Sequence, residues 1–160
     1  MLRFLLNMRS VARFMLMFPL GVWVGGIIFF SFVVAPALFR ILPNPAMAGS
    51  VVNVTLTDLH RIGIACGAVF LATTFIVEPG NAKGLRTLVG VMLVLTAISL
   101  FGIMPQMERI RASVGGSIEA LPHQDAGRAA FDRLHQLSVG LEGVVLLAGI
   151  VSFAVLSRET

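Results

Sequence analysis

Charged residues are scarce in this sequence. Asp, Glu, Lys and Arg make up only 12% of its 160 residues, whereas 57% are hydrophobic and the mean hydropathy is +0.93. An ordinary soluble domain carries about 25% charged residues, roughly twice this share. The composition therefore excludes a soluble protein and predicts an integral membrane protein in contact with a lipid bilayer.

Cysteine and clustered basic residues are also nearly absent. Cys66 is the only cysteine, which excludes an internal disulfide and a multi-cysteine metal site; inside an apolar segment its thiol acts as a small hydrophobe. The net charge of +4 comes from eleven arginines and one lysine scattered at segment ends. Because no basic block alternates with aromatic residues, nucleic acid is not a predicted partner.

Four long apolar runs predict an all-α fold, a four-helix bundle in the membrane. At about 20 residues per crossing, four helices with short connections nearly fill the chain, so residues 1–160 form one domain. The predicted helices cover residues 14–40, 48–77, 85–104 and 126–157. The run from Phe14 to Phe39 holds no charge and exceeds the apolar core of a signal peptide, so we predict that it is retained as the first crossing.

Prolines and glycines divide these runs. Pro36 predicts a kink or an end of the first helix, and Pro105 predicts the end of the third, whose few polar residues mark it as scaffold. Residues 105–125 form the longest polar connection, with apolar residues every three or four positions, and predict a surface-lying amphipathic segment interrupted at residues 115–116. Asp125 is the predicted N-cap of the fourth helix.

Two small-residue pairs predict close helix packing. Gly21 and Gly25 flank Trp23 in the first helix, and Gly63 and Gly67 follow His60 in the second. Pairs of small residues four positions apart let the backbones of membrane helices approach each other.

The arginines ahead of the first helix predict the orientation. Lysines and arginines divide equally between the two sides of the predicted bundle, but Arg3, Arg9 and Arg13 precede the first crossing. Positive charge before the first helix favours the cytoplasmic side. We therefore predict a multi-pass protein of the bacterial inner membrane with both termini in the cytoplasm.

A few ionisable residues inside apolar helices indicate a site. Glu142 follows His135 by seven residues, which places both side chains on one helix face about 10 Å apart. His60 lies on the second helix, at a depth near the outer edge of the hydrocarbon that matches the depth of His135. Burying a carboxylate in hydrocarbon costs roughly 2.5 kcal/mol or more, so such a residue normally faces a partner inside the bundle.

These residues support two interpretations from different classes. His60 and His135 could hold a haem b iron from both faces, or bind copper or zinc together with Glu142, while Asp58 and Asp132 orient the imidazoles. In the alternative, the same groups only stabilise helix contacts in a non-catalytic assembly or accessory subunit, and the aspartates pair with nearby arginines. A transporter is a third, weaker hypothesis. His123 is predicted to be solvated in the polar loop, and a second copy of the chain or another membrane protein stays open as a partner.

Three stretches resemble a known family. They are WVGGIIFFSFVVAPALFRILP, LHRIG and FDRLHQLSVGLEGVVLLAG, and they look like the small four-helix membrane family of unknown function that includes transmembrane protein 205. The resemblance covers essentially the whole chain. That family is distantly similar to the copper-resistance protein D group and to HemJ-type protoporphyrinogen oxidases, which implies copper or haem.

The resemblance also implies roles for particular residues. It supports His60, His135 and Glu142 as the polar centre, with Trp23, Pro36 and Arg40 as flanking family positions and Arg40 beside the site. No lysine lies within a predicted helix, so the catalytic pattern of the HemJ-type proteins is not reproduced. Whether the protein is an enzyme therefore stays open.

Overall fold

The computed structural model describes residues 2–122 and 124–158, and this part of the chain is helical without any strand. In chain order it contains α1 (Leu2–Phe29), the π-helix η1 (Phe30–Val34), α2 (Ala35–Ile41), α3 (Pro45–Val77), α4 (Ala82–Ala97), the π-helix η2 (Ile98–Ile103), α5 (Met104–Ser113), the 3-10 turn η3 (Ile118–Ala120) and α6 (Ala126–Ser157). The predicted all-α fold is confirmed. His123 lies outside the described residues.

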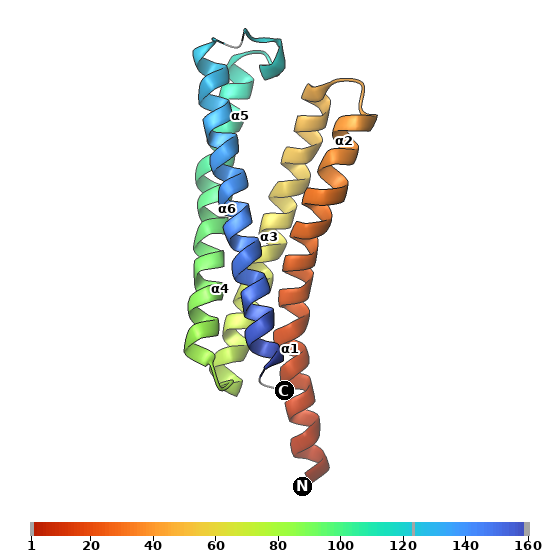
Figure 1. The fold of residues 1–160 in the computed structure, drawn as a ribbon, viewed down its shortest axis with the longest axis vertical. Coiled ribbons are helices and arrows are strands. Elements are labelled where there is room, and N and C mark those ends of the chain that lie inside the picture. Colours follow the sequence, from red (N-terminus) through yellow and green to blue (C-terminus); the bar gives the residue numbers. More distant parts are fainter. Residues whose placement is uncertain (1, 123, 159–160) are drawn as a thin grey trace.

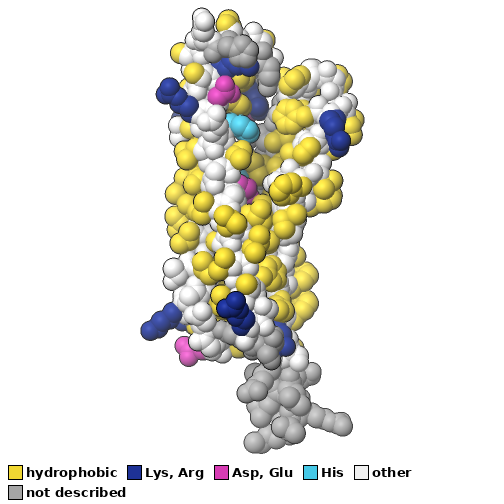
Figure 2. Space-filling view, viewed as in Figure 1, with side chains coloured by type: hydrophobic (Ala, Val, Ile, Leu, Met, Phe, Trp, Pro, Cys, Tyr) yellow, Lys and Arg dark blue, Asp and Glu magenta, His cyan; other side chains and the backbone are white. Residues whose placement is uncertain are grey.

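Eight of these nine elements make four rods, because α1, η1 and α2 run on without a break, as do α4, η2 and α5 (Figure 1). The turn η3 lies in the connection between α5 and α6. Each rod is long and apolar enough to cross a membrane: Ser10–Ile41, Pro45–Val77, Ala82–Ser113 and Ala126–Ser157. Charged side chains gather at the two ends of the bundle with an apolar belt between them (Figure 2). The chain is a multi-pass membrane protein, and its two ends lie at the same end of the bundle (Figure 1).

The third rod is longer than the sequence predicted. It passes Pro105 and ends at Ser113, whereas the prediction ended it near residue 104 and placed the following residues in a surface segment. A π-helix directly precedes α5 here, and another directly precedes α2 with Pro36. Proline lacks an N–H and crowds the carbonyl four residues earlier, and a π turn changes the local hydrogen-bond spacing so that the helix can continue.

Side-chain caps fix the starts of two rods. The Asn44 side chain accepts a hydrogen bond from the Met47 N–H at 2.8 Å, so α3 begins directly after the Pro43 turn. The Asp125 Oδ1 accepts from the N–H groups of Gly127 and Arg128 at 2.8 and 3.1 Å. Asp125 is therefore the N-cap of α6, as predicted.

Trp23 organises the core between α1 and α3. Its indole is 1% exposed and lies against Gly63 and Gly67, where an added Cβ would collide with the ring. This confirms close packing at the α3 pair. On α1 the close approach lies elsewhere than predicted: a Cβ on Gly25 would meet nothing within 4 Å, whereas one on Gly26 would lie 2.8 Å from Leu59 Cδ1. Trp23 lies between Gly63 and Gly67. At this crossing α1 therefore supplies the large side chain, and α3 supplies the space that its two glycines leave.

Candidate functional site

His60 and Glu142 meet between α3 and α6. His60 Nε2 and Glu142 Oε2 are 3.0 Å apart, and the two side chains are 2% and 16% exposed. Glu142 lies sixteen residues before Arg158, about 24 Å along an ideal helix, which places it within a hydrocarbon core about 30 Å thick. The structure therefore gives the membrane-embedded carboxyl group the partner that its burial requires.

Small residues below this pair bring the helices together. On α6, Gly149 leaves room for Val24 of α1, because an added Cβ there would collide with the valine side chain. On α3, Gly63 leaves room for Trp23 one turn from His60. The bundle is therefore closely packed up to the level of His60, and above it the rods diverge (Figure 1).

A cavity of about 400 Å³ opens where the rods diverge, between α1, η1, α3 and α6. Glu142 contributes the carboxyl group of its lining, Ser31 and Ser138 contribute hydroxyl groups, and the rest is largely apolar, including Ile27 and Phe30. Figure 2 shows this face hollowed between the two arms of the bundle, with acidic and histidine side chains among the apolar ones. The π-helix η1 forms part of the wall, and π turns inside α-helices occur frequently at functional sites.

The two partners face the cavity unequally. His60 is almost completely enclosed, and its second ring nitrogen, Nδ1, is buried without a hydrogen-bond partner. Glu142 is the part that lines the cavity, and no described residue bonds to its other oxygen, Oε1. The enclosed imidazole thus holds one carboxyl oxygen in place, while the other oxygen has no hydrogen-bond partner among the described residues.

His135 does not join this pair. It is exposed, stacks on Phe131 with ring centroids 6.5 Å apart, and lines a different cavity of about 240 Å³ between α2, α3, α5 and α6. Ser138 and Leu56 line both cavities, so the two spaces adjoin.

The residues predicted to orient the imidazoles lie apart from them. Asp58 pairs with Arg61 at 3.0 Å, and both side chains are more than 60% exposed. Asp132 and Arg40 are exposed, and neither makes a described contact with His60, His135 or Glu142. Asp58 thus has the arginine partner that the structural interpretation predicted for it.

The donor set for a metal or haem is not assembled in this geometry. Within residues 2–122 and 124–158, no three His, Cys, Asp or Glu side chains gather closely enough to hold one metal ion. A haem held by two histidines needs both imidazoles on opposite faces of one iron, but His60 is covered by Glu142 and His135 lines another cavity. The residues present do not fit either group as they stand.

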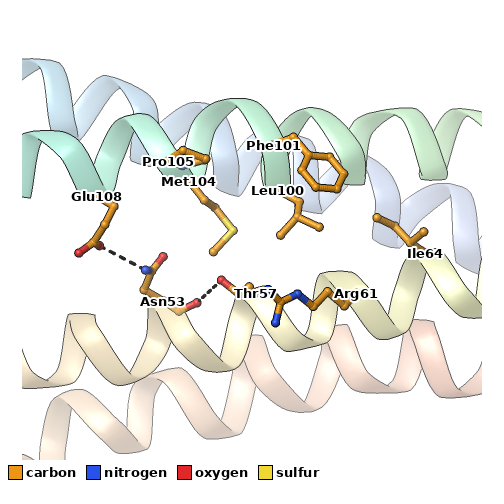
Figure 3. Close-up of a pocket in the computed structure, with 9 residues that line it drawn as sticks. All are labelled: Asn53, Thr57, Arg61, Ile64, Leu100, Phe101, Met104, Pro105 and Glu108. Atoms are coloured by element: carbon orange, nitrogen blue, oxygen red, sulfur yellow. Dashed lines mark hydrogen bonds between the residues drawn. The ribbon is translucent and has the colours of Figure 1, made fainter.

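A third cavity of about 480 Å³ lies between α3 and the η2–α5 rod (Figure 3). Asn53 Nδ2 donates to Glu108 Oε2 across it at 3.3 Å, and Thr57 donates back to the Asn53 carbonyl at 2.8 Å. Leu100, Phe101 and Met104 supply the opposite wall (Figure 3). Its polar groups are paired within the protein, and the hydrogen bond between Asn53 and Glu108 joins α3 to α5.

Arg111 and Ser138 were not predicted as site residues. Arg111 was predicted to lie in a surface segment, yet it is a largely buried residue of α5 that lines the 240 Å³ cavity. A signal was present: Leu100, Met104, Met107 and Arg111 follow one another at spacings of four, three and four residues, the repeat of one helix face. This repeat runs through Pro105 without interruption. Ser138 lies four residues before Glu142 and shares its face.

Comparisons with known proteins give the family. No curated protein and no solved structure is significantly similar to the chain. One family model, described as a domain of unknown function (DUF4149), matches residues 18–115, which run from α1 through α5 and include His60 and Arg111. Because the match covers more than half of the 160 residues, the chain belongs to the DUF4149 family.

Proposed function

We propose that this protein binds an apolar molecule with a hydrogen-bond donor, in the simplest case a protonated amine, inside the membrane. The observation that carries the proposal is the position of Glu142, whose carboxyl group lies in the wall of a 400 Å³ largely apolar cavity with one oxygen unpartnered. Hydrogen bonds to a charged group in such surroundings are about twice as strong as neutral ones.

His60 supports the carboxyl group in this role. The 3.0 Å contact to Nε2 fixes one oxygen of Glu142 and leaves the other directed to a ligand. Since His60 is itself enclosed, a ligand reaches the carboxyl group and not the imidazole. Glu142 is the recognition group, and His60 is its positioning residue.

A purely structural pair is the main alternative. In that case the protein is a non-catalytic assembly or accessory subunit, and His60 and Glu142 only join α3 to α6. The residual exposure of Glu142 and the cavity beside it favour a ligand, because a carboxyl group with a structural role alone gains nothing from a hollow at its free oxygen.

Binding of haem b or copper remains a proposal that rests on the sequence. The resemblance to the family of transmembrane protein 205 is likewise a proposal from the sequence. To bind iron or copper, His60 would have to exchange its bond to Glu142 for the metal, and His135 would need to approach it. We also retain the proposed location: the bacterial inner membrane, with both termini on the cytoplasmic side because Arg3, Arg9 and Arg13 precede the uncharged run from Phe14 to Phe39.

Binding of dodecylamine to the purified chain in nanodiscs tests the proposal. Trp23 is the only tryptophan and lies four residues before the cavity residue Ile27, so its emission reports occupancy. Dodecylamine should shift the emission saturably, whereas dodecanesulfonate, with the same chain and opposite charge, should not. Glu142→Gln should weaken dodecylamine binding about tenfold or more, the loss expected for one charged hydrogen bond.

The control is Asp58→Asn, which removes an exposed acid of α3 without touching the cavity. It should bind dodecylamine as the unaltered chain does. Equal binding by Glu142→Gln and Asp58→Asn would contradict the proposal, and absence of saturable binding in the unaltered chain would favour the structural alternative. If the unaltered chain showed a Soret band or stoichiometric copper and His60→Gln did not, the ligand would be haem or copper and the amine proposal would be wrong.

A further inference from the structure

Arg111 is a buried arginine without a hydrogen bond. Its side chain is 12% exposed, its Nε is buried without a partner, and no described residue accepts a hydrogen bond from its other nitrogens. The nearest carboxylate oxygen, Glu108 Oε2, lies 3.7 Å from Nη1, which makes a long ion pair but is beyond hydrogen-bond distance. By contrast, Arg86 and Arg128 each donate to a backbone carbonyl.

Three helices hold the guanidinium of Arg111 in place. Gly49 of α3 leaves the space for it, since an added Cβ there would lie 2.8 Å from Nη2. The ring of Phe131 on α6 lies 5.4 Å from the guanidinium carbon. These contacts position a cation by shape and by the face of an aromatic ring, and they leave its N–H groups without acceptors.

The cavity beside Arg111 carries further donors. His135 and the buried Ser138 line the same 240 Å³ space, and neither side chain is hydrogen-bonded within the described chain. The one acid in the lining is Glu108, which is 54% exposed and accepts a hydrogen bond from Asn53. The donors therefore line one cavity, while the exposed Glu108 carboxylate shares one oxygen between the hydrogen bond from Asn53 and the long ion pair with Arg111.

The depth of Arg111 places this cavity at the level of lipid headgroups. Arg111 follows Arg86, at the other end of the same rod, by twenty-five residues, which is about 37 Å along a helix. The hydrocarbon core is about 30 Å thick and the bilayer with its headgroups about 40 to 45 Å. The adjoining 400 Å³ cavity, reached past Leu56 and Ser138, is largely apolar.

We infer that this cavity binds the oxyanion head of an amphipathic molecule, a phosphate or carboxylate, with Arg111 as the principal ligand and His135 and Ser138 as further donors. An anion supplies the acceptors that a buried guanidinium lacks, and its planar N–H groups match two oxygens of such a group. The apolar part of the ligand lies toward the adjoining cavity. This site goes beyond the proposed amine site, because its charged group is Arg111 in place of Glu142 and its ligand carries the opposite charge.

Native mass spectrometry of the purified full chain tests the site by titration with dioleoyl phosphatidic acid. Dioleoylglycerol has the same acyl chains without the phosphate and should not bind at this site. Arg111→Met should lower the affinity for phosphatidic acid about tenfold or more, as expected for charged hydrogen bonds. Arg109→Met is the matched control, because Arg109 is exposed two residues away on the same helix.

Two further variants keep the result independent of folding. Arg111→Lys retains the charge but not the planar donors and should bind with intermediate affinity. Glu108→Gln removes the competing carboxylate and should tighten binding. Thermal unfolding of each variant shows whether the fold persists.

Competition with phosphatidic acid distinguishes a lipid headgroup from a soluble anion as the source of the oxyanion. Displacement of phosphatidic acid by millimolar inorganic phosphate would support the site with a soluble anion as its occupant, and displacement by oleate would support a carboxylate. Equal affinities for Arg111→Met and Arg109→Met in folded proteins would overturn the site. Dodecylamine binding at Glu142 should be unchanged in Arg111→Met, so that the two proposals succeed or fail separately.

Discussion

Substituting Gly63 by alanine tests the packing on which the cavity depends. Trp23 is 1% exposed and lies directly over this glycine, so the new methyl group would collide with the indole. The ring cannot turn away easily, because Gly67 and Leu93 confine the other side of the same notch. We expect Gly63→Ala to destabilise the bundle although alanine is the better helix former.

A comparison with Gly90→Ala isolates the free-energy cost of the collision with Trp23. Overpacking a well-filled core typically costs about 1 to 3 kcal/mol, and replacing glycine by alanine in a helix returns up to about 1 kcal/mol. Gly90 of α4 is helical too, but a Cβ there would meet nothing within 4 Å. Both variants receive the same gain in helix propensity, so the free energies of unfolding should differ by the collision alone, about 1 to 3 kcal/mol.

The measurement is a titration of sodium dodecyl sulfate into protein in mild detergent, followed by helical circular dichroism. Gly63→Ala should unfold at lower dodecyl sulfate than the unaltered chain, and Gly90→Ala at an equal or higher fraction. The loss caused by Gly63→Ala should be smaller when it is measured in a Trp23→Leu background, since the two residues are in contact. Equal midpoints for the two alanine variants would refute the packing of Trp23 against α3.

Three further results are expected. Glu78→Gly should raise the unfolding free energy by about 0.5 to 1 kcal/mol, because Glu78 ends α3 in a left-handed conformation with φ of 44° that glycine adopts freely; a lower midpoint in the same titration would contradict this. Arg86→Met should lower it by about 1.5 to 3 kcal/mol, since Arg86 donates to Thr74 Oγ1 and to its carbonyl, whereas exposed Lys83→Met should change it by less than about 0.5 kcal/mol. Reporter fusions at Asn81 and Ser117 should report cytoplasm and exterior respectively; the reverse at both sites would invert the predicted orientation.

Much of the fold follows from one-dimensional patterns. Four apolar runs, the proline turn before α3 and the Asp125 cap predicted the number of rods and the start of α6, because hydrophobic length and capping are local properties of the chain. The continuation through Pro105 had only one local signal, the one-face repeat from Leu100 to Arg111, against the usual helix-breaking effect of proline. The π turn that precedes α5 leaves no clear signature in the sequence.

The candidate site was predictable in part. Glu142 had to face a partner because of its burial in an apolar helix, and His60 was one of two candidates. Which imidazole it meets depends on how α3 and α6 cross, and that is set by Trp23 in its glycine notch and by Val24 against Gly149. Sequence spacing does not contain this information.

His135 shows why a shared helix face is not yet a shared site. His135 and Glu142 lie seven residues apart, so the face is the same but the levels differ by about 10 Å. At the level of Glu142 the neighbouring wall includes α1 and the His60 end of the packed core, whereas at the level of His135 the rods have diverged and α5 lies alongside. One stripe of α6 therefore serves two cavities, one with a carboxyl group on its wall and one with a guanidinium. The proposed amine and oxyanion sites follow from this change of neighbour along a single helix.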